Sequence, residues 1–271
     1  MTQIALGLVL SILIGAFGYW RRSLSPSGVA GAILVGTLIF GLGGWGWGVA
    51  LVVFFVSSSA LSHFKERQKE ALAEKFSKGS RRDLWQALAN GGAGALFALG
   101  NALWPSPAWW LAFLGAMATV NADTWATELG VLSRSQPRLI STGRVVEAGA
   151  SGGVTATGTL AAFAGGALIG AVGAGFDLAA GAVAGRALVL VLVAALAGLL
   201  GALVDSVLGA TVQVIYVCGA CGRETERHPV HSCGGATRRL RGWAWLDNDW
   251  VNFLSSAAGA VVATGIWLLI G

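Results

Sequence analysis

Apolar residues run along this chain in long blocks that are separated by short polar segments. A helix needs about 20 mainly apolar residues to cross a hydrocarbon core of about 30 Å. The blocks that approach this length cover residues 3–20, 28–44, 47–63, 84–104, 108–129, 153–173, 181–204 and 251–270. We therefore predict an all-α fold: a polytopic membrane protein with about eight transmembrane helices in a single integral membrane domain over residues 1–271.

The composition agrees with this interpretation. Of the 271 residues, 55% are hydrophobic and 11% are charged, which lies outside the range of soluble domains. The 41 glycines suit close helix packing in lipid, and the 12 tryptophans suit belts at the two membrane interfaces. The net charge of +5 comes from bases in the loops, which the positive-inside bias explains, so we infer no nucleic-acid binding.

Basic residues alternate between successive loops. Lys and Arg are concentrated in residues 21–22, 65–82, 134–144 and 223–241, whereas the intervening loops contain neither. The positive-inside rule then predicts that the charged loops are cytoplasmic and that both termini are extracytoplasmic. The first apolar block lacks the basic start and the cleavage site of a signal peptide. The charged stretch 65–78 is expected to be an interfacial or solvated helix rich in cations; the alternative is a substrate-binding role.

Carboxylates occur near the end of the fifth apolar block. Asn121, Thr124 and Glu128 form one helical stripe, and Asp123 with Thr127 forms an adjacent one. Acids at this depth are costly unless they are paired, protonated or bound to a cation. We expect a functional site here; the structural alternative is an ion pair with a loop arginine.

Further polar clusters occur at a similar depth. They are Asp83 with Gln86 and Asn90, Asp205 and Ser206 with Gln213, and Asp247 to Asp249 with Asn252. Magnesium prefers a few carboxylates together with water and the oxygens of a phosphate substrate, so acids presented by several helix ends suit Mg²⁺. The amides fit helix–helix hydrogen bonding equally well. No histidine recurs at metal spacing within these blocks, which argues against zinc or iron there.

The loop that follows the fifth block contains complementary groups. Thr142, Gly143 and Arg144 offer a hydroxyl, a flexible backbone and a bidentate cation. Gly149, Gly152 and Gly153 can expose backbone N–H groups at a helix start, where Ser151 is expected to be the N-cap. These residues suggest phosphate binding; the alternative is a glycine-rich turn, since no Walker pattern is present.

The three cysteines are confined to the last long loop, residues 216–242. Cys218-x2-Cys221 is followed by His231-x-Cys233, with His228 nearby. Four such ligands match a closed structural Zn²⁺ site, and the alternative is a cytoplasmic loop with reduced thiols. We expect no catalysis at this cluster.

At these motifs the sequence resembles an integral membrane family whose chloroplast member is phytyl-phosphate kinase, and whose bacterial members are catalogued as a domain of unknown function. The likeness covers nearly the whole chain. It rests on Arg82-Asp-x2-Gln86-x3-Asn90-Gly91, Asn121-Ala-Asp-Thr-x2-Thr-Glu-Leu-Gly130, Ser141-Thr-Gly-Arg144, Gly149-x2-Gly-Gly153, Asp205-Ser-x2-Gly209 with Gln213, and Asn248-Asp249-x2-Asn252. Thr127 departs from the expected serine. A fainter likeness links the middle of the chain to CTP-dependent polyprenol kinases and CDP-diacylglycerol synthases.

The resemblance implies an enzyme, a phosphotransferase that uses CTP to convert an isoprenyl monophosphate, a membrane lipid, into its diphosphate. It implies a location in the bacterial inner (plasma) membrane with the active site facing the cytoplasm. Mg²⁺ would be held by Asp123, Glu128, Asp205 and Asp249, and Arg144 would complete the catalytic set. Nucleotide and phosphate binding would involve Gln86, Asn90, Asn121, Thr124, Ser141, Thr142, Gly143, Gly149, Ser151, Gly152, Gly153, Gln213, Asn248 and Asn252.

Two other functions stay open. A CDP-lipid synthase (cytidylyltransferase) would use similar groups but attack the α-phosphate of CTP. A lipid transporter or scramblase would typically show inverted repeats and a helix interrupted near the bilayer midplane. The sequence shows no convincing repeat, and its polar residues collect at one predicted face.

Overall fold

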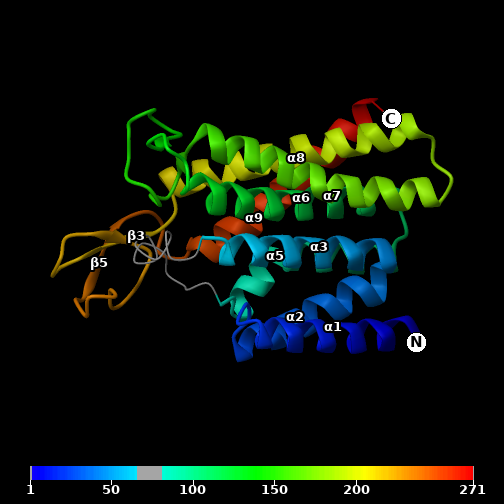
Figure 1. Ribbon diagram of the computed structural model, residues 1–271, viewed down its shortest axis with the longest axis horizontal. Helices are drawn as coiled ribbons and strands as arrows, with labels where there is room; N and C mark the ends of the chain where they lie inside the picture. The colour runs from blue at the N-terminus through cyan, green and yellow to red at the C-terminus, as the bar shows by residue number, and fades with distance from the viewer. Residues whose placement is uncertain (1, 66–80, 271) are drawn as a thin grey trace.

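The computed structural model describes residues 2–65 and 81–270, and it is mostly helical. Long helices form an elongated bundle (Figure 1). They are α1 (Thr2–Trp20), α2 (Pro26–Leu38) extended by the π-helix η1 (Ile39–Gly43), α3 (Trp45–His63), α5 (Leu84–Leu103), α6 (Pro107–Gly130), α7 (Ala156–Ala179), α8 (Ala184–Thr211) and α9 (Asn248–Ile270). Each coincides with a predicted apolar block. The predicted interfacial helix over 65–78 lies almost wholly outside the described residues.

Six helical segments are long and apolar enough to cross a membrane: α1, α2 with η1, α3, α7, α8 and α9. Of the described helices, α5 and α6 are not in this group. Helix α6 packs against α3, α5, α7, α8 and α9, and its residues 111–122 are all buried. Since α6 meets protein on most sides, polar residues cost less there than on a lipid-facing helix. The polytopic helical fold is confirmed; the count of eight spans and the side of the termini stay predictions.

The two ends of the bundle differ in their loops. Strands β1 (Arg138–Leu139) and β2 (Gly153–Val154) pair antiparallel, and β3 (Ile215–Cys218), β4 (Glu224–Thr225) and β5 (Thr237–Arg241) form a sheet of order β4-β3-β5. In Figure 1 these strands lie at one end of the bundle, whereas α1 begins and α9 ends at the opposite end. We call the end with the strands the loop end.

Small residues bring the central helices close together. A Cβ atom at Gly198 of α8 would lie 2.9 Å from the carbonyl oxygen of Ala118 on α6, and one at Gly201 would collide with Thr119. Both helices run toward the loop end, so their next turns carry Asp123 and Asp205 side by side at that end. Close helix packing thus sets the level of the two acids.

Helix α9 approaches α6 in the opposite direction. A Cβ atom at Gly259 would lie 2.9 Å from the carbonyl oxygen of Gly115 and would collide with Thr119. Because α9 starts at the loop end, the residues one and two turns before Gly259 lie toward the same level as the acids of α6 and α8. These residues are Ser255 and Asn252.

Three predicted local features were wrong. Helix α7 begins at Ala156 rather than residue 153, and its N-cap is Thr155, whose Oγ1 accepts the Gly158 N–H at 3.0 Å; Ser151 is not the cap. Helix α8 continues to Thr211, beyond the predicted 204, so Asp205 lies within the helix. Asp83 does not join the polar cluster, because it is the N-cap of α5 and forms a capping box with Gln86.

Candidate functional site

A polar cavity of about 270 Å³ opens at the loop end, between the C-terminal parts of α6 and α8, the N-terminal parts of α5 and α9, and the loop before α7. Four carboxylates line it: Asp123 and Glu128 from α6, Asp205 from α8, and Glu226 from the segment after β4. Among its described lining residues, Arg82 is the one cation. The cavity is therefore suited to a ligand that brings both negative charge and a metal ion.

Serine hydroxyls orient two of the acids. Ser62 Oγ donates to Glu128 Oε1 at 2.6 Å, and Ser255 Oγ donates to Asp205 Oδ2 at 3.1 Å. Within the described residues, these acids do not form a group of three or more whose ligand atoms lie within 4.8 Å of one another. This spacing suits Mg²⁺ that is held by one or two carboxylates, water and substrate phosphate rather than by a closed protein cage.

Amide side chains face the acids from two other helices. Gln86 and Asn90 of α5 and Asn248 and Asn252 of α9 line the cavity. Amides offer both donors and acceptors, which suits phosphate or ribose oxygens. Thr124 and Thr127 of α6 and Ser206 of α8 add hydroxyls to the cavity lining.

The loop over residues 149–153 forms the remaining wall. Gly149 and Gly152 have positive φ angles of 77° and 81°, and a Cβ at Gly152 would lie 2.6 Å from the backbone nitrogen of Ala210. Among the described residues, the N–H groups of Ser151 and Gly152 donate to no protein acceptor. Successive free N–H groups flanked by left-handed glycines are suited to an anion such as phosphate.

Gln213 connects this loop to the last polar segment. Ser151 Oγ donates to Gln213 Oε1 at 2.8 Å, and Gln213 Nε2 donates to Glu226 Oε1 at 2.9 Å. Gln213 is 1% exposed, so both bonds are shielded from solvent. The three side chains form one hydrogen-bonded wall of the cavity.

Several residues proposed from the sequence do not line the cavity. They are Arg144, Asp249, Asn121, Ser141, Thr142 and Gly143. Asn121 is fully buried, accepts a hydrogen bond from Ser57 Oγ at 2.9 Å and donates one to the Gly165 carbonyl at 2.7 Å, so it joins α3, α6 and α7. Residues 141–144 form an exposed turn that is closed by the Gly143 N–H on the Leu139 carbonyl.

The sequence interpretation did not include Ser62, Arg82 or Glu226 among the site residues. Arg82 stood in a family motif without an assigned role. Its guanidinium donates to Ser59 Oγ at 3.0 Å and lies over the rings of Phe54 and Phe55. Burial lowers the pKa of Arg82, and the Glu128 carboxylate acts in the opposite direction. No sequence pattern marked Glu226 as a site residue, because it lies in a charged loop that is distant in the sequence from the acids of α6.

An apolar cleft of about 70 Å³ adjoins the polar cavity. Side chains of α1, α2, α3 and α5 line it, including Val35 and Leu51, together with Leu24 from the segment between α1 and α2. Arg82, Gln86 and Asn90 line both spaces, so the cleft and the cavity meet at these three polar residues.

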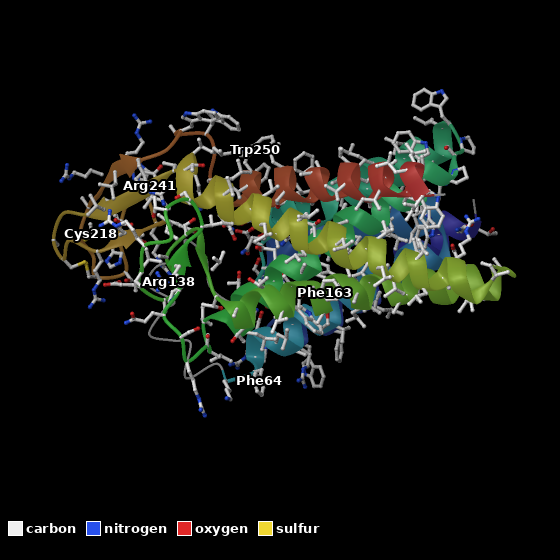
Figure 2. All side chains as sticks on the ribbon, turned by 90° about the horizontal axis from the view of Figure 1, so that it is seen from above. Phe64, Arg138, Phe163, Cys218, Arg241 and Trp250 are labelled. Atoms are coloured by element: carbon white, nitrogen blue, oxygen red, sulfur yellow. The ribbon has the colours of Figure 1, made fainter. Side chains whose placement is uncertain are left out.

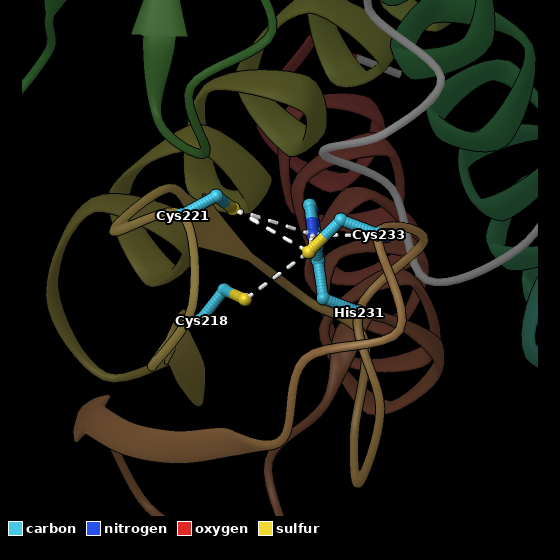
Figure 3. Close-up of side chains that lie close together, drawn as sticks. All are labelled: Cys218, Cys221, His231 and Cys233. Atoms are coloured by element: carbon cyan, nitrogen blue, oxygen red, sulfur yellow. Dashed lines mark hydrogen bonds between the residues drawn. The ribbon is translucent and has the colours of Figure 1, made fainter.

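The Cys/His cluster lies farther out at the loop end, where Figure 2 labels Cys218, and Figure 3 shows its four side chains. The four ligand atoms, from Cys218, Cys221, His231 and Cys233, all lie within 4.8 Å of one another. The three cysteines are free, and a backbone hydrogen bond from Cys221 lowers the pKa of the Cys218 thiol to about 7. Thiolate is the form that binds metals.

Fold and site together define a polytopic helical membrane protein with an acid-lined cavity at one end of its bundle. The chain belongs to the family described as integral membrane protein DUF92, whose family model matches residues 9–260. This membership confirms the family resemblance that was drawn from the sequence motifs, and with the apolar helices it assigns the chain to a membrane.

Three relatives show how far the likeness extends. The chain is 36% identical to Protein PGR of Arabidopsis thaliana, over 93% of this chain and 92% of that protein. It is 31% identical to an uncharacterized membrane protein of Synechocystis sp., over 91% and 83% of the two chains. It is 26% identical to the chloroplastic Protein VTE6 of Arabidopsis thaliana, over 89% of this chain and 64% of that one. No solved structure matches the chain.

Proposed function

We propose that this protein is a CTP-dependent prenyl-phosphate kinase that transfers a phosphoryl group to an isoprenyl monophosphate. The family likeness, which includes the chloroplastic relative, supports a kinase of prenyl phosphates at the level of the family. The observation that carries the proposal for this chain is the junction of a polar, acid-lined cavity with an apolar cleft at Arg82, Gln86 and Asn90. A lipid phosphate has the same two parts, a charged head and an apolar tail.

The reaction needs no general base. The second pKa of a phosphate monoester is about 6, so at neutral pH the attacking oxygen of the lipid phosphate is already ionised. That oxygen bonds to the γ-phosphorus of CTP while the bond from the γ-phosphorus to the β,γ-bridging oxygen breaks, and CDP leaves with that electron pair. The protein must supply alignment and neutralisation of charge.

The cavity residues divide this work. Asp123, Glu128 and Asp205 would hold Mg²⁺, directly or through water, against the phosphates of CTP. The N–H groups of Ser151 and Gly152 would bind nucleotide phosphate oxygens, and the amides of α5 and α9 would orient phosphate or ribose. Asp249 lies outside the cavity, so we assign it no contact with the metal.

We assign the phosphate-binding cation to Arg82 rather than to Arg144. Arg82 lies at the junction of cavity and cleft, where the phosphate of a lipid would be, and its contacts with Ser59, Phe54 and Phe55 hold the guanidinium in place. A planar guanidinium can bind two phosphate oxygens at once. Arg144 lies in an exposed turn that does not reach the cavity.

The isoprenyl tail would occupy the apolar cleft. Helix α1 packs mainly on α2 and η1, whereas α3 packs mainly on α6 and also contacts α7 and η1; the cleft lies among α1, α2, α3 and α5. Burial of each methylene group stabilises a bound chain by about 0.8 kcal/mol, which favours a tail over water in this space. We further propose that the cavity faces the cytoplasm in a bacterial plasma membrane, because the basic loops surround it.

Mass spectrometry of the products tests the proposal. The purified protein is incubated with CTP, Mg²⁺ and isoprenyl monophosphates of several lengths. Lipid diphosphate and CDP are expected. A CDP-lipid with pyrophosphate would identify a cytidylyltransferase instead, and lipid movement across vesicles without use of CTP would identify a transporter.

A further inference from the structure

The segment between α8 and α9 contains a side-chain cluster that the kinase reaction does not use. Cys218 and Cys221 flank one tight turn, and His231 and Cys233 flank a second. Each turn is followed by a glycine with positive φ, Gly222 at 72° and Gly234 at 83°. The two halves thus present their ligands from similar turns toward one point, as Figure 3 shows.

The distances in the cluster match a tetrahedral zinc centre. With Zn–S of about 2.3 Å and Zn–N of about 2.0 Å, two sulfurs should lie about 3.8 Å apart and a sulfur and a nitrogen about 3.5 Å apart. Cys233 Sγ lies 3.5 Å from Cys218 Sγ and 3.7 Å from Cys221 Sγ. His231 Nδ1 lies 3.6 Å from Cys221 Sγ and 3.1 Å from Cys233 Sγ.

Hydrogen bonds around the cluster hold its ligands in place, as in structural zinc sites. His231 is 3% exposed and directs Nδ1 to the sulfurs, while its Nε2 lies 3.5 Å from Ser232 Oγ. Cys218 is 1% exposed, and backbone bonds from Gly222 N–H to the Cys218 carbonyl and from His231 N–H to the Gly235 carbonyl close the two turns. Four converging ligands leave no open position for a substrate.

The sheet connects this cluster to the cavity wall. Cys218 ends β3, whose four residues span about 10 Å, and Gln213 lies just before the other end of that strand. Strand β4 pairs with β3 and runs directly into Glu226, which accepts the Gln213 hydrogen bond. On the far side of β3, Arg241 of β5 donates to the Gly209 carbonyl of α8 at 3.0 Å.

We propose that Cys218, Cys221, His231 and Cys233 bind one structural Zn²⁺, and that this ion fixes the β3–β5 sheet so that Gln213 and Glu226 stay in the cavity wall. The strands are short and carry exposed charged residues, so they bury little apolar surface of their own. A bound ion supplies the missing stabilisation. The zinc site does not depend on which reaction the cavity performs.

Metal analysis tests the site itself. The protein is purified without added metal, and its zinc content is measured by inductively coupled plasma mass spectrometry. We expect about one zinc ion per chain in the wild type and in Ala220→Ser, which changes the same turn but keeps all four ligands. Cys221→Ser should lose the zinc, and His231→Cys, which exchanges one ligand for another and retains four, should keep it. A folded wild type that contains no zinc would overturn the proposal.

Hydrogen–deuterium exchange tests the connection to the cavity. On zinc removal, or in Cys221→Ser, exchange should become faster in residues 215–226 and also in residues 149–153, because Ser151 loses its fixed partner Gln213. Ala220→Ser should leave both segments unchanged. Faster exchange confined to residues 218–236 would overturn the support of the cavity wall, whatever the outcome of the kinase assay.

Discussion

The polar cavity and the Cys/His cluster lie at the same end of the bundle but are assembled differently. The cavity collects side chains from five helices, α3, α5, α6, α8 and α9, and from the segments between them, which are far apart in the sequence. The cluster takes its ligands from two turns within residues 218–233. Helix packing therefore holds the cavity together, whereas we propose that a bound ion holds the two turns of the cluster together.

This difference has consequences for mutation. A change of charge in the cavity should lower the reaction rate but leave the fold intact, because glycine and alanine contacts between α6, α8 and α9 position the helices. A lost ligand in the cluster should impair the local fold first. Turnover and thermal stability, measured on matched variants, separate these two responses.

The largest effect is expected for Asp123→Asn. The amide keeps the volume of the side chain but removes the charge proposed for Mg²⁺, so turnover should fall by about 100-fold or more. Melting temperature should change little. Turnover and thermal unfolding are measured together, with Asp177→Asn near the end of α7 as the matched control. Full activity in Asp123→Asn would indicate that Asp123 has a structural role and does not hold the metal.

The two arginines provide the next comparison. Arg82→Lys should lower kcat/KM by about 10- to 100-fold, because one ammonium group cannot replace a bidentate guanidinium. Arg144→Lys should have little effect, since Arg144 lies outside the cavity. Steady-state kinetics of both variants at equal folded fraction decides between them. A larger loss of kcat/KM in Arg144→Lys than in Arg82→Lys would indicate that the phosphate binds at the exposed turn.

Cys221→Ser is expected to have a smaller effect, and mainly on thermal stability rather than on turnover. Loss of zinc should lower the melting temperature by roughly 4–8 °C if it costs about 2 kcal/mol. The initial rate at low temperature should fall by a smaller factor than in Asp123→Asn. Thermal unfolding with and without a chelator provides the measurement, because a chelator should shift the wild type but not the variant. An unchanged melting temperature would argue for ordinary thiols.

The apolar cleft should show the smallest effect. Leu51→Trp fills part of the cleft and should raise KM for long isoprenyl phosphates by about tenfold, the cost of excluding roughly two methylene groups. Short-chain substrates should be affected less. Leu34→Trp, at a position on α2 that is 50% exposed, is the control. An equal rise in KM for substrates of all chain lengths would indicate that the tail does not bind in this cleft.

Much of the fold followed from apolar block length, because a membrane core demands a narrow range of helix lengths. Helix ends were less predictable. Residues 149–153 stay outside α7 because Gly152 needs a positive φ and a close approach to Ala210, neither of which spacing reveals. Asp83 was misassigned since a helix N-cap and a deep polar residue look alike in sequence.

The candidate site was predictable where its residues share a helix. The acids of α6 and the amides of α5 and α9 follow helical spacing, so their common faces could be inferred. Glu226 and Arg82 could not be, because their positions depend on how a sheet and a helix start fold back onto the bundle. The cluster at Cys218 is local in sequence, and its geometry agrees with the spacing that predicted it.

The most direct test of the proposed kinase activity follows the γ-phosphorus of CTP. Wild-type protein and Asp123→Asn are incubated with CTP labelled at the γ-phosphorus, Mg²⁺ and an isoprenyl monophosphate, and the lipid products are separated. We expect label on the terminal phosphate of the lipid diphosphate in the wild type and almost none in the variant. Label found only in pyrophosphate, with cytidine on the lipid, would contradict it.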